Sequence, residues 1–235
     1  MNKKIMLMGI LLVFSLGLSA CGEPGLSIDS KQQDDVNIIV NGTTDSEAKV
    51  SFEDKSGEKE NEDVDKDGKF SIHFPRLTST VNYKVTSKKG DKITTKSVSV
   101  PKQKPLTDYE TLKDHFNTFS ERADDLSVTI PEELDKDSHV NNGFRINTDG
   151  SNVMSVLLIY APENSLLGME SYADFYYSIG ALSSSLDISS DVEKLLKTLT
   201  NSQENEKDTE VNISGVTYKF SSTGGITSAS IFPAN

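Results

Sequence analysis

The stretch FRINTDGSNVMSVLLIY, residues 144–160, decides the fold of the second half of the chain. Phe144 and Ile146 alternate with polar residues, as in a strand that is buried on one face. Asp149-Gly150 then predicts a tight turn. Val153 to Tyr160 is almost continuously apolar, which is typical of a central strand covered on both faces. The stretch therefore predicts an antiparallel hairpin at the centre of a sheet.

Helical periodicity precedes this hairpin. Apolar residues recur at spacings of three and four from Tyr109 to Leu126, so one face of the predicted helix is apolar. Thr107 and Glu110 form a capping-box pair at its start. This helix needs a surface to cover, and the hairpin is the expected surface.

Further helices and strands follow the hairpin. The spacing predicts one helix from Met169 to Leu182 and another from Val192 to Leu199, the second capped by Ser190 with Glu193, and the serines at 183–185 predict a bend between them. Short strands are expected from residue 211 onward. The order of helix, hairpin, helices and hairpin predicts an α+β domain over residues 106–235, an antiparallel sheet with helices on one face.

Residues 36–101 show a different period. Apolar residues alternate in short segments that end at Asn41-Gly42, Asp67-Gly68 and Gly90-Asp91, which predicts antiparallel strands and no helix. The segments VNGTTDSEAKVSF, VDKDGKFSI and NYKVTSKKGDKITTKSVSV resemble bacterial Ig-like domains, and the resemblance implies a small β-sandwich that serves as a spacer or adhesive module. Residues 102–105 are the expected linker, so the chain is predicted to be multidomain: an all-β Ig-like sandwich followed by the α+β domain.

The N-terminus carries an export signal. Lys3 and Lys4 precede an apolar run that is too short to span a membrane comfortably, so residues 1–20 are predicted to be a secretory signal peptide. The residues Leu18-Ser19-Ala20-Cys21 resemble the lipobox of bacterial lipoproteins. This resemblance implies recognition of Leu18, Ser19 and Ala20 by the signal peptidase, cleavage before Cys21 and a diacylglyceryl group on its thiol. Two acyl chains anchor a protein lastingly, which a single chain does not.

Residues 21–35 are polar and rich in Gly, Ser, Gln and Asp, so a flexible tether is expected there. The anchor places the protein at the cell membrane, facing outside the cytoplasm. A glycine after Cys21 carries no inner-membrane retention signal, and the Lys-rich n-region and the lack of tryptophan favour a Gram-positive cell surface.

Composition excludes several classes of function. The 235 residues include 24 Lys+Arg and 36 Asp+Glu, and removal of the signal peptide leaves a net charge of -14, which disfavours a nucleic-acid partner. One cysteine excludes an intramolecular disulfide and a zinc site built on several cysteines. We therefore expect no cofactor and no resident metal.

No catalytic motif is present. The three histidines, His73, His115 and His139, lie in different predicted elements, and the chain has no nucleophile elbow, P-loop or zinc-protease motif. Asp63, Asp65 and Asp67 resemble the opening of an EF-hand calcium loop, but the position that should supply the bidentate glutamate is Phe74. The sequence therefore favours an acidic turn that leads into a strand, with a weak surface calcium site as the alternative. The segment from Glu53 to Asp67 is expected to be a solvated acidic loop.

One aromatic set suggests recognition. Tyr172, Phe175 and Tyr176, together with Tyr160, are expected either to pack a helix on the sheet or to contact a ligand, because tyrosine is enriched at interfaces. The sequence thus favours a non-catalytic lipoprotein that presents its C-terminal domain to a protein, peptide or cell-wall ligand. The alternative is a cell-envelope enzyme whose active site is assembled from distant residues of 106–235.

Overall fold

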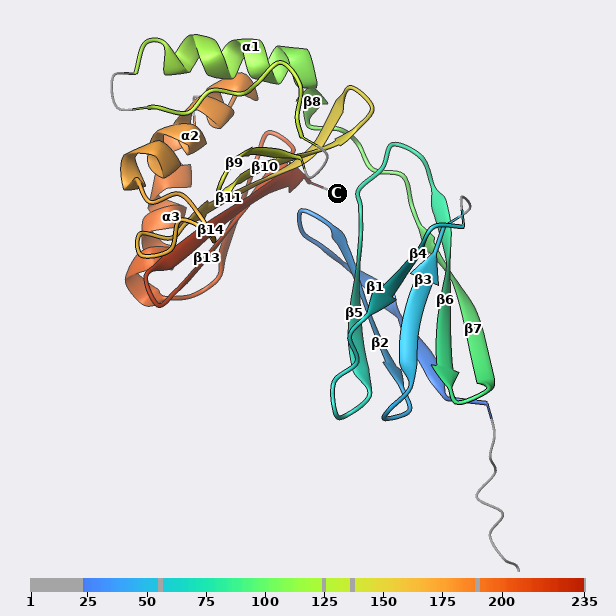
Figure 1. Ribbon diagram of the computed structural model, residues 1–235. Coiled ribbons are helices and arrows are strands. Elements are labelled where there is room, and N and C mark those ends of the chain that lie inside the picture. Colours follow the sequence, from blue (N-terminus) through green and yellow to red (C-terminus); the bar gives the residue numbers. More distant parts are fainter. Residues whose placement is uncertain (1–22, 55–56, 124–125, 136–137, 189–190, 235) are drawn as a thin grey trace, which may run out of the picture.

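The computed structural model describes residues 23–54, 57–123, 126–135, 138–188 and 191–234 (Figure 1). Strands take up 45% of the chain and helices 20%, so the fold is mostly β, with three antiparallel sheets and three helices among the described residues. None of the described helices is long and apolar enough to cross a membrane. The predicted signal peptide and Cys21 lie outside the described residues.

The first two sheets contain residues of the N-terminal half. The three-stranded sheet has the order β1-β2-β5 and the four-stranded sheet the order β4-β3-β6-β7. Side chains of both sheets meet in one core that includes Phe52, Phe74 and Tyr83, whose rings are in mutual contact. The strands are β1 (Leu26–Asp34), β2 (Ile38–Thr44), β3 (Lys49–Glu53), β4 (Lys59–Glu62), β5 (Lys69–Phe74), β6 (Val81–Lys89) and β7 (Lys92–Val100).

Two expectations for this half are wrong. β1 occupies Leu26–Asp34, within the segment expected to be a flexible tether, and pairs with β2. Its polar sequence suffices because an edge strand is held by main-chain hydrogen bonds, and Leu26 alone is buried in the core. β4 likewise lies in the segment expected to be a solvated loop, and its exposed charged residues form the edge of the second sheet.

The third sheet lies in the C-terminal half and has the order β12-β13-β14-β11-β10-β9, with β8 paired to β11. The predicted hairpin is confirmed, since β10 and β11 pair through the turn at Asp149-Gly150 and β11 is a central strand. The strands are β8 (Thr107–Asp108), β9 (His139–Asn141), β10 (Phe144–Asp149), β11 (Asn152–Tyr160), β12 (Thr209–Ile213), β13 (Val216–Thr223) and β14 (Ile226–Pro233).

Three helices, α1 (Tyr109–Ser120), α2 (Tyr172–Ser185) and α3 (Val192–Asn205), pack against one face of this sheet (Figure 1). Their apolar residues share a core with alternate residues of the strands, which therefore point toward the helices. The core side chains from the helices include Leu112, Phe116, Phe175, Ile179, Leu182, Leu195 and Leu199, and those from the strands include Phe144, Ile146, Val156, Leu158, Tyr218, Phe220 and Ile231.

The helix ends differ from the sequence expectations. Asp108, and not Thr107, caps α1 by accepting a hydrogen bond from the backbone N–H of Glu110 at 3.0 Å, because Thr107 pairs with β11 as part of β8. The helix ends at Ser120, before the expected Leu126. Met169 lies before α2, which begins after its cap Ser171.

The serines at 183–185 belong to the last turn of α2 and do not form the expected bend. Ser183 and Ser185 donate hydrogen bonds to the carbonyls of Ile179 and Ala181, so their buried hydroxyls are satisfied within the helix. Asp191 is the residue before α3, and the expected cap Ser190 lies outside the described residues.

A buried arginine joins the two halves. Arg76, in the loop between β5 and β6, is only 2% exposed. Its Nε donates to the carbonyl of Asp35 at 2.7 Å, Nη1 to Gln103 at 3.1 Å and Nη2 to Asp34 at 3.0 Å. Its guanidinium lies over the ring of Phe232 in β14, 4.6 Å from the ring centre, a cation–π contact. All the polar contacts come from the N-terminal half and the linker, while the ring comes from the C-terminal sheet.

Direct hydrogen bonds between the halves surround Arg76. Lys219 of β13 donates to Asp35 at 2.8 Å, and Ser155 of β11 donates to the carbonyl of Val36 at 2.8 Å. At the turn between β10 and β11, Asp149 accepts from the backbone N–H and the hydroxyl of Thr78 at 2.8 and 2.5 Å. We call these residues, together with Arg76 and Phe232, the junction.

The predicted linker contributes to the junction. The backbone N–H of Gln103 donates to the carbonyl of Leu77 at 2.7 Å, and that of Lys102 to the hydroxyl of Thr80 at 3.2 Å. The hydrophobic cores of the two halves form separate clusters. The halves thus keep their own cores but meet through polar contacts on both sides of a hydrogen-bonded linker.

We expect Arg76→Ala to lower the free energy of unfolding by about 3 kcal/mol, because it leaves buried polar groups of the junction without partners. Cleavage by a protease within residues 101–105 should become faster. The matched control is Lys84→Ala, which removes an exposed ion pair with Glu53 and should cost no more than about 1 kcal/mol. Equal unfolding free energies of the two variants in urea would contradict this account of the junction.

The pair formed by Asp35 and Lys219 predicts a pH dependence. Burial alone would raise the pKa of Asp35, but the hydrogen bond and charge of Lys219 and the N–H of Val36 hold it below its ordinary value of 3.8. A lowered pKa stabilises the fold above the ordinary value, and the stabilisation is lost as the pH falls through the folded-state pKa.

The stability difference between the unmodified chain and Asp35→Asn should therefore shrink as the pH falls below about 4. Lys219→Met should remove the same acid-side dependence, because it takes away the partner that lowers the pKa. Unfolding in urea between pH 2 and 7 measures both differences. A difference that does not change with pH would show that the ion pair does not stabilise the junction.

Candidate functional site

The face of the C-terminal sheet opposite the helices is divided into two parts. Strand pairing places His139, Arg145 and Leu157 side by side across β9, β10 and β11, and Leu157 pairs with Ser230 of β14. The junction covers the neighbouring part of this face, where Ser155, Lys219 and Phe232 meet the N-terminal half. The part that carries Arg145, Leu157 and Ile159 is not covered by the junction.

This uncovered part is hollowed into a groove of about 290 Å³. Leu157 and Ile159 form an apolar floor, because they are two residues apart on β11 and so share a face of the sheet. The loop between β11 and α2 forms one wall and the turn between β9 and β10 the other. The groove is lined by His139, Asn142, Gly143, Phe144, Arg145, Leu157, Ile159, Leu166 and Leu167.

The wall carries two exposed leucines. Leu166 is 88% exposed and Leu167 is 53% exposed, so both have left most of their apolar surface in water. Leaving such a side chain exposed forgoes about 2 kcal/mol of burial energy. An exposed apolar pair beside an apolar groove is typical of an interaction surface.

Hydrogen bonds hold these leucines in place. Asn164 accepts from the backbone N–H groups of Leu166, through its side chain, and of Leu167 and Gly168, through its carbonyl. The N–H of Met169 donates to the carbonyl of Ile159 at 2.8 Å, which fixes the loop to β11. A Cβ at Gly168 would lie 2.7 Å from that same carbonyl, so only glycine permits this close approach. The leucines are therefore presented by a structured loop.

A second hollow adjoins the groove on the other side of Leu167. It is about 380 Å³ in volume and lies between the same loop and the turn joining β13 to β14. Ile226, at that turn, is 39% exposed. The apolar surface thus continues past Leu167 toward the end of the sheet.

Polar groups stand at the opposite rim. An Nη of Arg145 lies 2.8 Å from Nε2 of His139, and Nδ1 of that ring lies 3.4 Å from Asp135. Because arginine can only donate, His139 accepts at Nε2 and keeps its proton on Nδ1, toward Asp135. Asp135, His139 and Arg145 thus form a chain of polar contacts that holds the guanidinium of Arg145 beside the groove.

The aromatic residues Tyr172, Phe175 and Tyr176 serve mainly to pack α2 against its neighbours. Phe175 is fully buried in the core, so it cannot contact a ligand in the folded chain. Tyr176 is partly buried beside Tyr172 and Tyr177. Tyr172 is 42% exposed, and its hydroxyl donates to Gln203 of α3 at 3.2 Å. Of the set, Tyr172 alone offers substantial surface, and it belongs to the contact between two helices.

The histidines and the aspartates at 63–67 form no common site. His73 and His115 are exposed on β5 and α1, and only His139 borders the groove. Asp65 accepts hydrogen bonds from the backbone N–H groups of Asp67 and Lys69. These bonds form the turn that precedes β5. No group of three or more His, Cys, Asp or Glu side chains in the described part of the chain is arranged to hold a metal ion.

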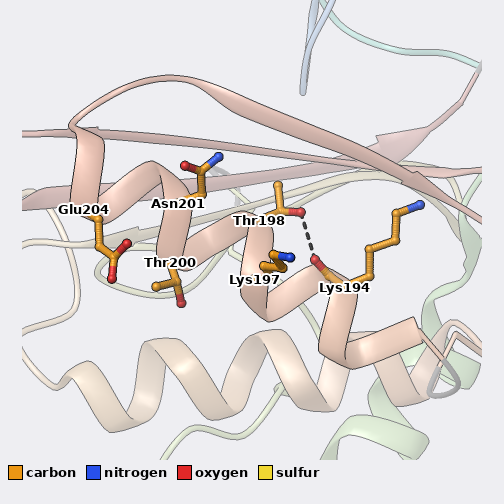
Figure 2. A pocket seen from close by; sticks show the side chains of 6 residues that line it. All are labelled: Lys194, Lys197, Thr198, Thr200, Asn201 and Glu204. Atoms are coloured by element: carbon orange, nitrogen blue, oxygen red, sulfur yellow. Dashed lines mark hydrogen bonds between the residues drawn. The ribbon is translucent and has the colours of Figure 1, made fainter.

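A larger hollow on α3 is an unsuitable candidate. It is about 640 Å³ in volume, but its lining comes from α3 alone (Figure 2). The side chains of Thr200 and Glu204 point to one side of the helix, whereas those of Lys194 and Asn201 point to the other. The one hydrogen bond drawn joins Thr198 to the carbonyl of Lys194. A site needs polar groups that converge from several elements, and these diverge.

Local sequence patterns do not reveal the groove. The segment ENSLLGME, residues 163–170, has two adjacent leucines among mainly polar residues, and this is the one sequence feature that points to an exposed apolar surface. Arg145 and Leu157 could not be assigned to one surface, because their side-by-side position depends on the register between β10 and β11.

We expect Phe175→Ala to cost about 3–5 kcal/mol of unfolding free energy, because it empties a fully buried position of the core. Tyr172→Ala should cost about 1 kcal/mol, since it removes a half-exposed ring and one exposed hydrogen bond. Urea unfolding of both variants measures the difference. If Tyr172→Ala proved the more costly, the aromatic set would not be the packing contact that its burial indicates.

The chain was compared with protein-family models, with curated proteins and with solved structures. No family model matches it, and no curated protein or solved structure shows significant similarity to it. The groove is therefore interpreted from its own geometry and chemistry.

Proposed function

We propose that the chain is a lipid-anchored, extracytoplasmic binding protein that recognises a protein or peptide through the groove of its C-terminal half. The single observation that carries the binding role is the exposed pair Leu166 and Leu167 beside the apolar floor of Leu157 and Ile159. The side chains at the rim suit binding, since the His139 ring lies between Arg145 and Asp135 and holds the guanidinium beside the groove.

The organisation of the chain supports this function. In this proposal Cys21 bears the lipid, and residues 36–101 form an Ig-like sandwich that acts as a spacer. Residues 106–235 form the α+β domain that presents the groove. β1 begins at Leu26, a few residues after Cys21 in the sequence, so in this proposal the spacer begins close to the membrane. The groove lies on the C-terminal sheet, which the junction joins to the N-terminal half.

The anchor is tested by Cys21→Ala, which should leave the precursor unprocessed by the lipoprotein pathway and shift the protein out of the detergent phase. The physical reason is that the thiol is the only group in the chain to which the diacylglyceryl group could be attached in a lipobox. Detergent-phase partitioning of the unmodified protein and the variant measures this. Continued partitioning of the Cys21→Ala variant would contradict lipid anchoring at this residue.

The groove is tested by the double variant Leu166→Asp and Leu167→Asp. Peptides selected from a displayed random library on the immobilised unmodified chain should bind the double variant at least about tenfold more weakly, a loss of about 1.4 kcal/mol. The control is Ile93→Asp, which charges another half-exposed apolar residue, on β7 of the N-terminal half. It should leave the affinities unchanged.

Thermal unfolding of both variants checks that they are folded, since the replaced leucines are exposed. Selected peptides that bind the double variant as tightly as the unmodified chain would contradict the groove as the binding site. Equal weakening by Ile93→Asp would also contradict it, because the effect would then follow charge and not position.

A further inference from the structure

We propose that the groove binds the C-terminus of a peptide, with the terminal carboxylate on Arg145 and an apolar last side chain on Leu157 and Ile159. This inference rests on the proposed function and names the ligand of the same site. It depends on the juxtaposition of an apolar floor with a cation that makes no direct ion pair among the described residues.

Arg145 has no carboxylate partner among the described residues. Within the described part of the chain, its side chain donates one hydrogen bond, to His139, which uses a single N–H of the five that a guanidinium carries. The other cation on this face is Lys219, and it is already paired with Asp35 of the junction. Arg145 is therefore the cation that this face, as far as the structure describes it, leaves for an external anion.

The negative charge of the chain makes the position of Arg145 a clue to the ligand. The chain carries a formal charge of -12, so its field repels anions over most of the surface. A cation held next to an apolar floor selects against a purely apolar ligand, which would leave the guanidinium desolvated without a partner. It favours a ligand that has a carboxylate and an apolar group close together.

Strand pairing places the backbone of Arg145 beside the apolar floor. Arg145 and Leu157 are directly opposite each other on paired strands, so their Cβ atoms lie about 5 Å apart. Ile159 lies two residues further along the same face, about 7 Å from Leu157. The guanidinium lies beside His139 at the rim, and it lines the same groove as Leu157 and Ile159, so a single C-terminal residue can place its carboxylate on Arg145 and its side chain on the floor. Arginine can bind that carboxylate with two parallel hydrogen bonds.

The size of the groove favours a peptide end over a whole small molecule. Sites that enclose a small ligand measure about 300–1,000 Å³, and this groove lies at the lower limit and is open to solvent. It can hold one or two side chains of a longer chain that continues outward along Leu166 and Leu167. Capture of a terminal carboxylate is an established mode of peptide recognition.

The probes are N-acetyl-leucyl-leucine, with a free carboxylate, and its amide, with none. Both are titrated into the ¹⁵N-labelled chain beginning at residue 22, which contains every described element and lacks only the lipid. We expect backbone amide shifts around residues 139–145, 157–159 and 166–168, and at least a fivefold tighter dissociation constant for the carboxylate than for the amide. Arg145→Gln should abolish this preference without changing the affinity for the amide, and Arg145→Lys should retain part of it.

Arg122→Gln is the matched control, because it removes the same charge from an exposed position after α1 and should preserve the preference. If both probes bind in the groove equally, the terminal-carboxylate inference fails while the groove stays a binding site. If neither probe shifts these residues, the inference fails together with the groove. If decanoate binds more tightly than the dipeptide with the same dependence on Arg145, the ligand is a fatty acid and the peptide assignment is overturned.

Discussion

The buried guanidinium of Arg76 is the interaction on which the arrangement of this chain depends. It hydrogen-bonds to residues before β2 and to the linker, and it lies on a ring of the last strand. A buried guanidinium is costly unless each polar edge has a partner and its flat face is covered. The N-terminal half supplies the partners, and the C-terminal sheet supplies the cover. Both halves therefore contribute contacts to the Arg76 side chain, although their hydrophobic cores are separate.

This constraint also determines which surface is free for binding. The sheet has one face under the helices, and the junction takes part of the other face through Ser155, Lys219 and Phe232. The remaining part is where Arg145 meets Leu157 and Ile159. Its polar and apolar groups are each fixed by neighbours, Arg145 by His139 and the leucine loop by Asn164. A pre-organised surface of this kind loses little entropy on binding, which favours recognition of a short segment.

Local patterns in the sequence predicted the local parts of the fold. The apolar run from Val153 to Tyr160 and the turn at Asp149-Gly150 were assigned correctly, because strand periodicity and turn chemistry act over a few residues. β1 was missed because its polar residues are held by pairing with β2, which its own composition does not show. The cap of α1 was assigned to Thr107 because the pairing of Thr107 with β11 is a distant contact. The groove escaped prediction for the same reason, since it depends on the register that joins Arg145 to Leu157. The lipobox, by contrast, is read entirely from adjacent residues and stays a prediction.

The central claim is that the Arg76 junction holds the two halves as one body and leaves the groove uncovered beside it, on the same face of the C-terminal sheet. Residual dipolar couplings of backbone amides, measured on the weakly aligned chain beginning at residue 22, test this claim most directly. We predict that couplings from residues 26–100 and from residues 106–234 fit one alignment tensor of the same magnitude and orientation, and that Arg76→Ala separates them into two. Two different tensors in the unmodified chain would contradict the claim, because the halves would then move independently.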